Sequence, residues 1–156
     1  MNSFKSNQIK SLMFVVAISL LTLSDAKVVA NEVPTIDREK STVLITGSNR
    51  GIGLSLAQNY AEQGWNVIAT CRKPNKAMDL ISLKKEYSNV NIEELDVTSQ
   101  DQIIALANKY DGIPIDVLLN NAGILGEVQD QVFGGLNDQT FNQVFAVNTL
   151  APLKVS

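Results

Sequence analysis

Thr46-Gly47-Ser48-Asn49-Arg50-Gly51-Ile52-Gly53 follows directly after the apolar run Val43-Leu44-Ile45, and a segment typical of a helix comes next. Glycines at this spacing between a strand and a helix allow a sharp turn, because glycine adopts conformations that other residues avoid. They also let bare N–H groups and a helix N-terminus approach a pyrophosphate. We therefore predict that Gly47 to Gly53 form a phosphate-binding loop. A plain tight turn is the alternative interpretation.

The composition limits the class of protein. Of the 156 residues, 45% are hydrophobic and 19% are charged, which is typical of one soluble globular domain. The net charge of −3 and the lack of a Lys/Arg run argue against a nucleic-acid partner. The chain has no histidine, which excludes His triads and His metal sites, and its single Cys71 cannot form an internal disulfide. No metal is expected.

Residues 1–30 have the three parts of a secretory signal peptide. Lys5 and Lys10 precede an apolar run over residues 12–23, and small residues follow it. The apolar run is shorter than the roughly 20 residues that a membrane-spanning helix needs. The sequence therefore predicts no permanent membrane span.

Cleavage of this segment after Ala30 or after Ala26 fits the small-residue rule, and we favour Ala30. Residues 31–40 would then be a polar lead-in, and the protein would be secreted or exported. In the alternative, the segment is uncleaved or the true start lies downstream, and the protein is then cytoplasmic.

The rest of the chain alternates between strand and helix patterns. Consecutive apolar residues are typical of strands that are buried on both faces, and Ser99 and Gln102 have the spacing of a capping box. Strands are predicted at 41–46, 66–70, 90–97 and 115–119, and helices at 51–63, about 75–87, 99–110 and from about 137, after a loop at 123–135. The predicted fold class is α/β, a doubly wound parallel sheet (Rossmann fold) over residues 41–156, incomplete after the fourth strand.

The end of the second strand indicates which dinucleotide binds. An acidic residue there favours NAD, whereas a basic residue accommodates the 2′-phosphate of NADP. This chain has Cys71-Arg72-Lys73 at that place and no acid, and a guanidinium can pair with a phosphate through two hydrogen bonds. Arg50 could reach the same phosphate. We predict NADP(H) over NAD(H), the alternative being that Arg72 and Lys73 are a solvated loop pair.

At this point the chain resembles the classical short-chain dehydrogenase/reductase family. Four motifs carry the resemblance in the family's order: the glycine loop, Asp96-Val97, Asn120-Asn121-Ala122-Gly123 and Asn148. Within the family, the amino-acid sequence at residues 69–72, 114–123 and 144–152 resembles that of the sniffer/C-factor type of NADPH-dependent carbonyl reductase. The resemblance covers about residues 41–156.

The resemblance implies a role for each motif. The glycine loop would hold the pyrophosphate, Asp96 would accept the adenine amino group, and the Val97 backbone would support the ring. The fourth-strand motif would close against the adenosine ribose and stabilise the central sheet through Asn120, Asn121, Ala122 and Gly123. From the residues alone, Asp96 could instead cap the next helix, and the two asparagines could be turn formers.

Asn148 is the only catalytic residue of the family that the resemblance finds in this chain. Phe141, Val144 and Phe145 precede it at helical spacing, so a helix would carry its amide on a buried apolar face. A buried amide needs hydrogen-bond partners. The resemblance implies that Asn148 holds a water in a proton relay, and a local structural hydrogen bond is the alternative.

The family's catalytic Ser and Tyr-x-x-x-Lys would lie beyond this chain. Tyr60 and Tyr110 belong to helices of the cofactor half, and Tyr87 has no lysine four residues later. The implied function is hydride transfer between NADP(H) and a small-molecule carbonyl or alcohol substrate. A catalytically inert NADP(H)-binding or signalling protein is the alternative, and a methyltransferase of similar fold fits the motifs less well.

One edge of the sheet and one face of the last helix would be left uncovered in this chain. The resemblance implies a possible homodimer through that helix.

Overall fold

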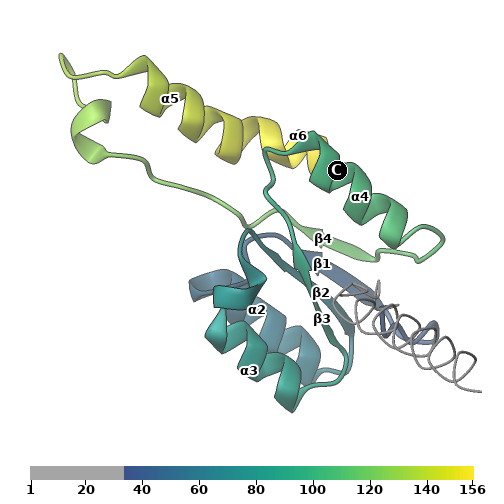
Figure 1. Ribbon diagram of the computed structural model, residues 1–156. Coiled ribbons are helices and arrows are strands. Elements are labelled where there is room, and N and C mark those ends of the chain that lie inside the picture. The colour runs from purple at the N-terminus through teal and green to yellow at the C-terminus, as the bar shows by residue number, and fades with distance from the viewer. Residues whose placement is uncertain (1–33) are drawn as a thin grey trace, which may run out of the picture. The chain divides into compact units, whose positions relative to one another are not determined.

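The computed structural model describes residues 34–156, and these contain a parallel α/β sheet with helices on both faces (Figure 1). The predicted signal peptide and its cleavage sites lie outside the described residues. The four strands are β1 (Thr42–Ile45), β2 (Asn66–Cys71), β3 (Val90–Glu94) and β4 (Val117–Leu119). They are ordered β3-β2-β1-β4, and every neighbouring pair is parallel. The predicted fold class is confirmed.

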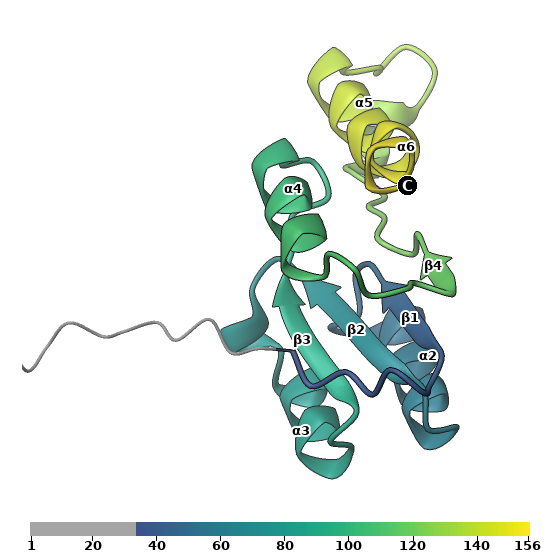
Figure 2. The ribbon, with the colours of Figure 1, turned by 90° about the vertical axis from the view of Figure 1, so that its right-hand side faces the viewer.

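Helices cover both faces of the sheet (Figure 2). α2 (Gly51–Glu62) and α3 (Met78–Glu86) pack on one face, and α4 (Gln100–Lys109) and α6 (Ala151–Val155) pack on the other. Alternate residues of β1 serve the two faces, because Val43 and Ile45 join one core and Leu44 joins the other. This is why the strand reads as consecutive apolar residues and does not alternate with polar ones.

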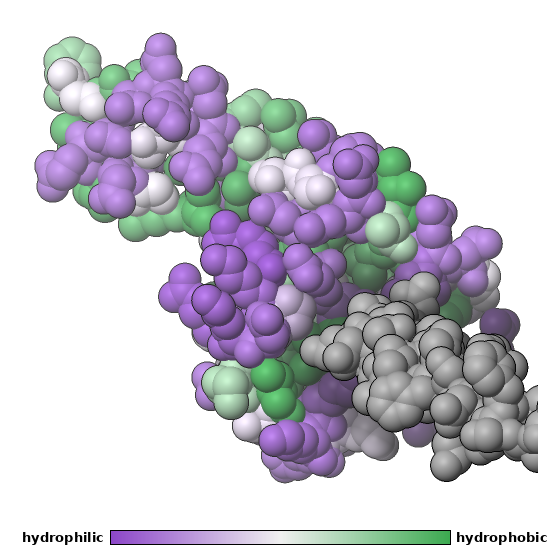
Figure 3. All heavy atoms as spheres, viewed as in Figure 1, coloured by the Kyte–Doolittle hydropathy of each residue, from purple (hydrophilic) through white to green (hydrophobic). Residues whose placement is uncertain are grey.

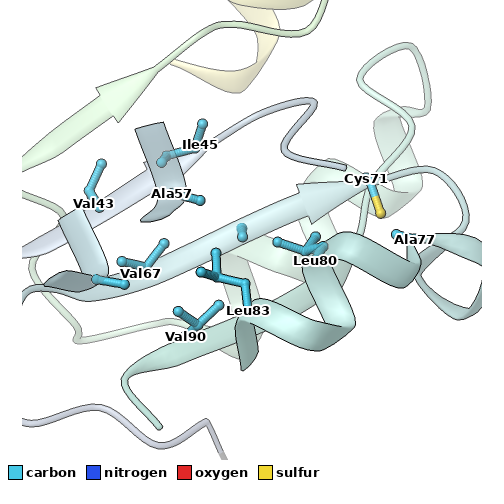
Figure 4. Packing of buried hydrophobic residues seen from close by; sticks show 11 residues of the cluster. Val43, Ile45, Ala57, Val67, Cys71, Ala77, Leu80, Leu83 and Val90 are labelled. Atoms are coloured by element: carbon cyan, nitrogen blue, oxygen red, sulfur yellow. The ribbon is translucent and has the colours of Figure 1, made fainter. Parts of the chain in front are cut away.

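The core under α2 and α3 contains more buried residues than the core on the other face, and Figure 4 shows its packing. Ala57 of α2 lies over Val43 and Ile45, while Leu80 and Leu83 of α3 pack toward β2 and β3. The small residues of α2 let that helix lie close to β1. Because only residues 46–50 connect β1 to α2, the N-terminus of α2 lies at the carboxyl end of β1.

Several predicted boundaries shift. β3 ends at Glu94 and not at residue 97, because the chain leaves the sheet before Asp96 to form a turn. The helix predicted at 75–87 is a 3₁₀ turn (Pro74–Lys76) followed by α3, and the loop at 123–135 contains a second 3₁₀ turn, Val128–Gln131. β4 begins only at Val117, since Asp116 instead bridges to Thr42 through its carboxylate (2.7 Å) and its backbone N–H (2.9 Å).

The described part of the lead-in, residues 34–40, is attached to the sheet by two buried asparagines. Asn91 of β3 pairs with the Thr35 backbone through both its amide oxygen (3.1 Å) and its amide nitrogen (3.0 Å). Asn66 of β2 accepts the Asp37 N–H at 2.9 Å and donates to the Asp37 carbonyl at 2.8 Å. A segment with a polar sequence is therefore bound to the sheet through its backbone.

The last helix starts after Asn137, as predicted, and has three parts: α5 (Asp138–Phe145), a π turn (Ala146–Leu150) and α6. The Asn137 side chain caps it by accepting the N–H groups of Gln139 and Thr140. In α5 the rings of Phe141 and Phe145 stack with centroids 6.2 Å apart, yet they are 53% and 43% exposed. Figure 3 shows hydrophobic residues at the surface in this region.

The prediction that Asn148 lies on a buried face is therefore wrong. Asn148 is exposed, and so are Phe141 and Phe145 on the same side of the helix. Across that same part of the chain, no helix has the length and apolar character needed to cross a bilayer.

Candidate nucleotide-binding site

The glycine loop takes the backbone form that the sequence predicts. Gly47 and Gly51 have φ of +69° and +57°, in the region that favours glycine. Ser48 lies fully buried between them: its hydroxyl donates to the Ile45 carbonyl at 2.8 Å and its N–H donates to the Thr70 carbonyl at 2.8 Å. Ser48 therefore holds the loop onto β1 through its side chain and onto β2 through its N–H.

Two of the glycines are required by close packing. A Cβ on Gly47 would lie 2.9 Å from the Ala122 Cα, and one on Gly53 would overlap the Gly47 carbonyl and lie 2.5 Å from Asn121 Nδ2. Apart from its chain neighbours and the backbone of its own helix, no atom of residues 34–156 lies within 4 Å of the corresponding position on Gly51, so its positive φ explains that glycine. The loop is thus a cradle in which side chains are excluded at Gly47 and Gly53.

The cradle opens onto the N-terminus of α2. Arg50 is the N-cap residue, with extended backbone (φ −164°), and its side chain makes no capping hydrogen bond. The first N–H groups of a helix lack partners within the helix, and they carry the positive end of its dipole. Together with the bare loop, they form an arrangement that suits a phosphate.

Asn121 locks the cradle to the end of β4. Its amide nitrogen donates to the carbonyls of Thr46 (2.9 Å) and Gly47 (3.1 Å). The Thr46 hydroxyl in turn accepts the N–H groups of Asn121 and Ala122, each at 3.0 Å. Asn121 thus joins the glycine loop to β4. Asn120 points elsewhere: its amide lies 3.3 Å from the Ser156 hydroxyl, at the end of α6.

These elements enclose a cleft of about 360 Å³ at the carboxyl ends of the strands. Its lining includes most of the predicted cofactor residues, namely Gly47, Asn49, Arg50, Gly51, Ile52, Gly53, Arg72, Asp96, Val97, Asn121, Ala122 and Gly123. Ser48, Asn120 and Asn148 do not line it. Sequence reasoning missed Cys71, Leu95, Ile124 and Val147, and being next to a motif residue was the only signal for them.

A second hollow of about 530 Å³ adjoins the cleft and shares Asn49, Cys71, Arg72 and Asp96 with it. It is further lined by Lys73, Lys76, Ala77, Glu94 and Gln102. We call it the basic hollow, because Arg72, Lys73 and Lys76 outnumber its two acids. Burial raises the pKa of the Cys71 thiol above its ordinary value, the Glu94 charge adds to this and a hydrogen bond to the Lys73 backbone opposes it, so the thiol stays neutral there at neutral pH.

Asp96 lies where the cleft and the basic hollow meet. Its Oδ1 accepts hydrogen bonds from the Thr98 hydroxyl (2.6 Å) and the Thr98 N–H (2.9 Å). The Thr98 hydroxyl bond, helped by the Thr98 N–H and the Arg72 charge, lowers the pKa of Asp96 below its usual value against a partial desolvation. Asp96 does not cap α4, because Ser99 does so by accepting the Gln102 N–H. The capping alternative for Asp96 is therefore wrong.

Asn148 uses both of its side-chain polar atoms on one residue. Its Oδ1 accepts the Ile124 N–H at 2.9 Å, and its Nδ2 donates to the Ile124 carbonyl at 2.8 Å. The π turn that contains Asn148 is thereby joined to the loop after Gly123. These bonds join segments 24 residues apart, so they are not the local hydrogen bond that the sequence left open as an alternative. Residues 34–156 contain no cluster of acids and cysteine that could hold a metal ion.

The glycine cradle, the exposed helix N-terminus and the cleft at the carboxyl ends of a parallel sheet define a Rossmann-type fold, the class of fold in which dinucleotides bind at this edge of the sheet. Comparison with known proteins specifies the family. Residues 41–156 match the family described as short chain dehydrogenase, and the chain belongs to this family, whose members are NAD(P)-dependent oxidoreductases.

The similar proteins include an oxidoreductase of Bacillus subtilis, YvrD, which is 34% identical over 119 residues, or 76% of this chain and 44% of YvrD. A short-chain dehydrogenase/reductase of Burkholderia multivorans, solved with bound NADP, aligns with a TM-score of 0.68 and 32% identity over 74% of this chain and 51% of its own. The NADPH-bound carbonyl reductase from chicken fatty liver aligns with a TM-score of 0.66 and 30% identity over 80% and 48%. The chain spans about half the length of these relatives.

Proposed function

We propose that this chain is the cofactor-binding part of an NADP(H)-dependent carbonyl reductase of the short-chain dehydrogenase/reductase family. The observation that carries the cofactor choice is the end of β2, where Arg72 lines both the cleft and the basic hollow and no acid accompanies it on that strand. Lys73 and Lys76 lie in the same hollow. Two similar structures are described as bound to NADP or NADPH, which supports the choice.

The residues that are present fit such a cofactor. The cradle at Gly47 and Gly53 has no room for a Cβ, which leaves N–H groups bare for the pyrophosphate. Ionised Asp96 is an acceptor for the adenine amino group, and Arg72 is a donor for the 2′-phosphate. The bound nicotinamide would supply the hydride for a carbonyl substrate.

Among the described residues, the lining of the cleft contains no tyrosine or lysine that could donate a proton to the carbonyl. In our proposal the catalytic Ser and Tyr-x-x-x-Lys are encoded downstream of Ser156, and Asn148 orders the loop after Gly123 so that a relay water can be held near the π turn. Sequencing the transcript past the Ser156 codon tests this directly. An in-frame Ser and Tyr-x-x-x-Lys would support the reductase, and a stop codon would favour the inert NADP(H)-binding protein.

The cofactor preference is tested by calorimetry with NADPH and NADH. We expect the chain to bind NADPH more tightly, and Arg72→Ala to weaken NADPH binding by about tenfold while leaving NADH unchanged, because one charge-assisted contact is lost. Arg38→Ala is the matched control, since Arg38 lies in the lead-in and lines neither the cleft nor the basic hollow. Equal affinity of the unmodified chain for both nucleotides would contradict the proposal.

A further inference from the structure

The Gln102 side chain makes a hydrogen bond to the Asp96 backbone that differs from the bond expected at its position in the helix. It is the third residue of α4, and in a capping box such a side chain returns to the N–H of the N-cap residue. That N–H, on Ser99, already donates to the Asp96 carbonyl at 2.9 Å. The Gln102 side chain reaches past it, and its Oε1 accepts the Asp96 N–H at 2.6 Å.

The Asp96 backbone is therefore held at both of its polar groups by the start of α4. Ser99 fixes the carbonyl and Gln102 fixes the N–H. Gln102 is itself anchored, because its own N–H donates to the Ser99 hydroxyl. The peptide planes on both sides of the Asp96 Cα are therefore each held by a hydrogen bond to α4 or its N-cap.

The Asp96 carboxylate is fixed as well, but through only one oxygen. Thr98 makes both of its hydrogen bonds to Oδ1. Among residues 34–156, no protein donor bonds to Oδ2, and Asp96 lines both the cleft and the basic hollow. One oxygen thus orients the carboxylate, and the other remains as an acceptor for a ligand.

We infer that Gln102 is a positioning residue for adenine recognition: it holds the Asp96 backbone so that Oδ2 can accept a hydrogen bond from the exocyclic amine of the base. This rests on the proposed nucleotide-binding function. Gln102 acts through Asp96. Removing the Gln102 side-chain oxygen would leave the Asp96 carboxylate in place but less well oriented. We therefore expect a loss of selectivity for the base and no loss of phosphate binding.

The test compares NADPH with its hypoxanthine analogue, which has a carbonyl oxygen in place of the amine. The unmodified chain should prefer NADPH, because Asp96 repels that oxygen. Gln102→Met has a similar shape but lacks the oxygen acceptor, and we expect it to lose about three- to tenfold of the preference, the range of one ordinary hydrogen bond. Gln102→Glu retains an acceptor oxygen and should restore most of it.

The control is Gln100→Met, which changes an exposed residue in the first turn of α4 and should leave the preference intact. Because the readout is a ratio of affinities within one variant, a smaller folded fraction does not alter it. Retention of the full preference in Gln102→Met, or its absence in the unmodified chain, would overturn this inference alone. Failure of the unmodified chain to bind either dinucleotide would overturn the proposed function and, with it, this inference.

Discussion

At the scale of single residues, the glycine cradle depends on contacts between segments that lie far apart in the sequence. Gly53 faces the Gly47 carbonyl and Asn121 Nδ2, and Asn121 is the residue that joins the cradle to β4. A methyl group at Gly53 would therefore displace the hydrogen bonds that give the cradle its shape. Gly64, in contrast, has open space around it and a φ of +81°.

We expect Gly53→Ala to lower the free energy of unfolding by about 1–3 kcal/mol, the range for overpacking. It should also weaken dinucleotide binding by at least about tenfold, since Asn121 and the Gly47 backbone must move. Gly64→Ala should lower stability by about 1–2 kcal/mol through backbone strain and leave binding unchanged. Urea unfolding and calorimetry measure both effects, and normal binding by Gly53→Ala would contradict the packing argument.

At the scale of elements, the end of α4 is attached to β3 because two of its side chains bond to the Glu93 carboxylate. The Tyr110 hydroxyl donates to Glu93 Oε1 at 2.7 Å, and Lys109 Nζ lies 2.8 Å from Glu93 Oε2. Burial first, and then the hydrogen bond and the charge of Glu93, raise the pKa of Tyr110 well above its ordinary value. The phenol therefore stays neutral in the folded protein at a pH where it ionises in the unfolded chain.

The sign of the pH effect follows from this difference. A raised folded-state pKa gives stability that is fully present below the unfolded value, about pH 10 for tyrosine, and lost as pH rises above it. We expect Tyr110→Phe to cost about 1 kcal/mol at neutral pH and to make alkaline unfolding less steep above about pH 10. Thermal unfolding between pH 7 and 11 checks this, with Tyr60→Phe as the control. Identical alkaline profiles for Tyr110→Phe and the unmodified chain would refute it.

The last helix shows how element-scale prediction succeeds and fails. Its start at Asn137 was predictable because the cap is a local hydrogen-bonding pattern. The burial of Asn148 was not, because helical spacing shows which residues share a face and does not show whether another element covers that face. Phe141 and Phe145 share a face as expected, and that face is exposed.

At the scale of the whole molecule, this exposed face supports the proposed homodimer. Exposed apolar side chains clustered on one helix are typical of an association surface. We expect sedimentation velocity to show concentration-dependent self-association, which the double variant Phe141→Ser/Phe145→Ser should abolish. Phe133→Ser is the control, because Phe133 is more exposed than either of them but lies in the preceding loop. Self-association that survives the double variant would place the interface elsewhere.

Export of the protein also remains a proposal at this scale. Cleavage after Ala30 would leave every described contact of the lead-in intact, because the first of them is made by Thr35. We expect mass spectrometry of protein from a secreting host to give Asn31 as the mature N-terminus, or Lys27 for cleavage after Ala26. An intact Met1 on the purified protein would instead favour the uncleaved, cytoplasmic alternative.

What the sequence determined by itself was the local and periodic part of the protein. Runs of buried apolar residues identified the four strands, glycine spacing identified the phosphate loop, and the ends of the strands identified Arg72 and Asp96 as residues of the cleft. These features are encoded within a few residues, since strand periodicity and turn geometry are short-range properties.

Only the tertiary structure decided how side chains from distant segments are used. It brought the Asn121 side chain to the carbonyls of Thr46 and Gly47, and the Asn148 side chain to the backbone of Ile124. A polar side chain bonds to whichever backbone group the fold brings within reach. That partner depends on strand order and helix packing, which no short stretch of sequence contains.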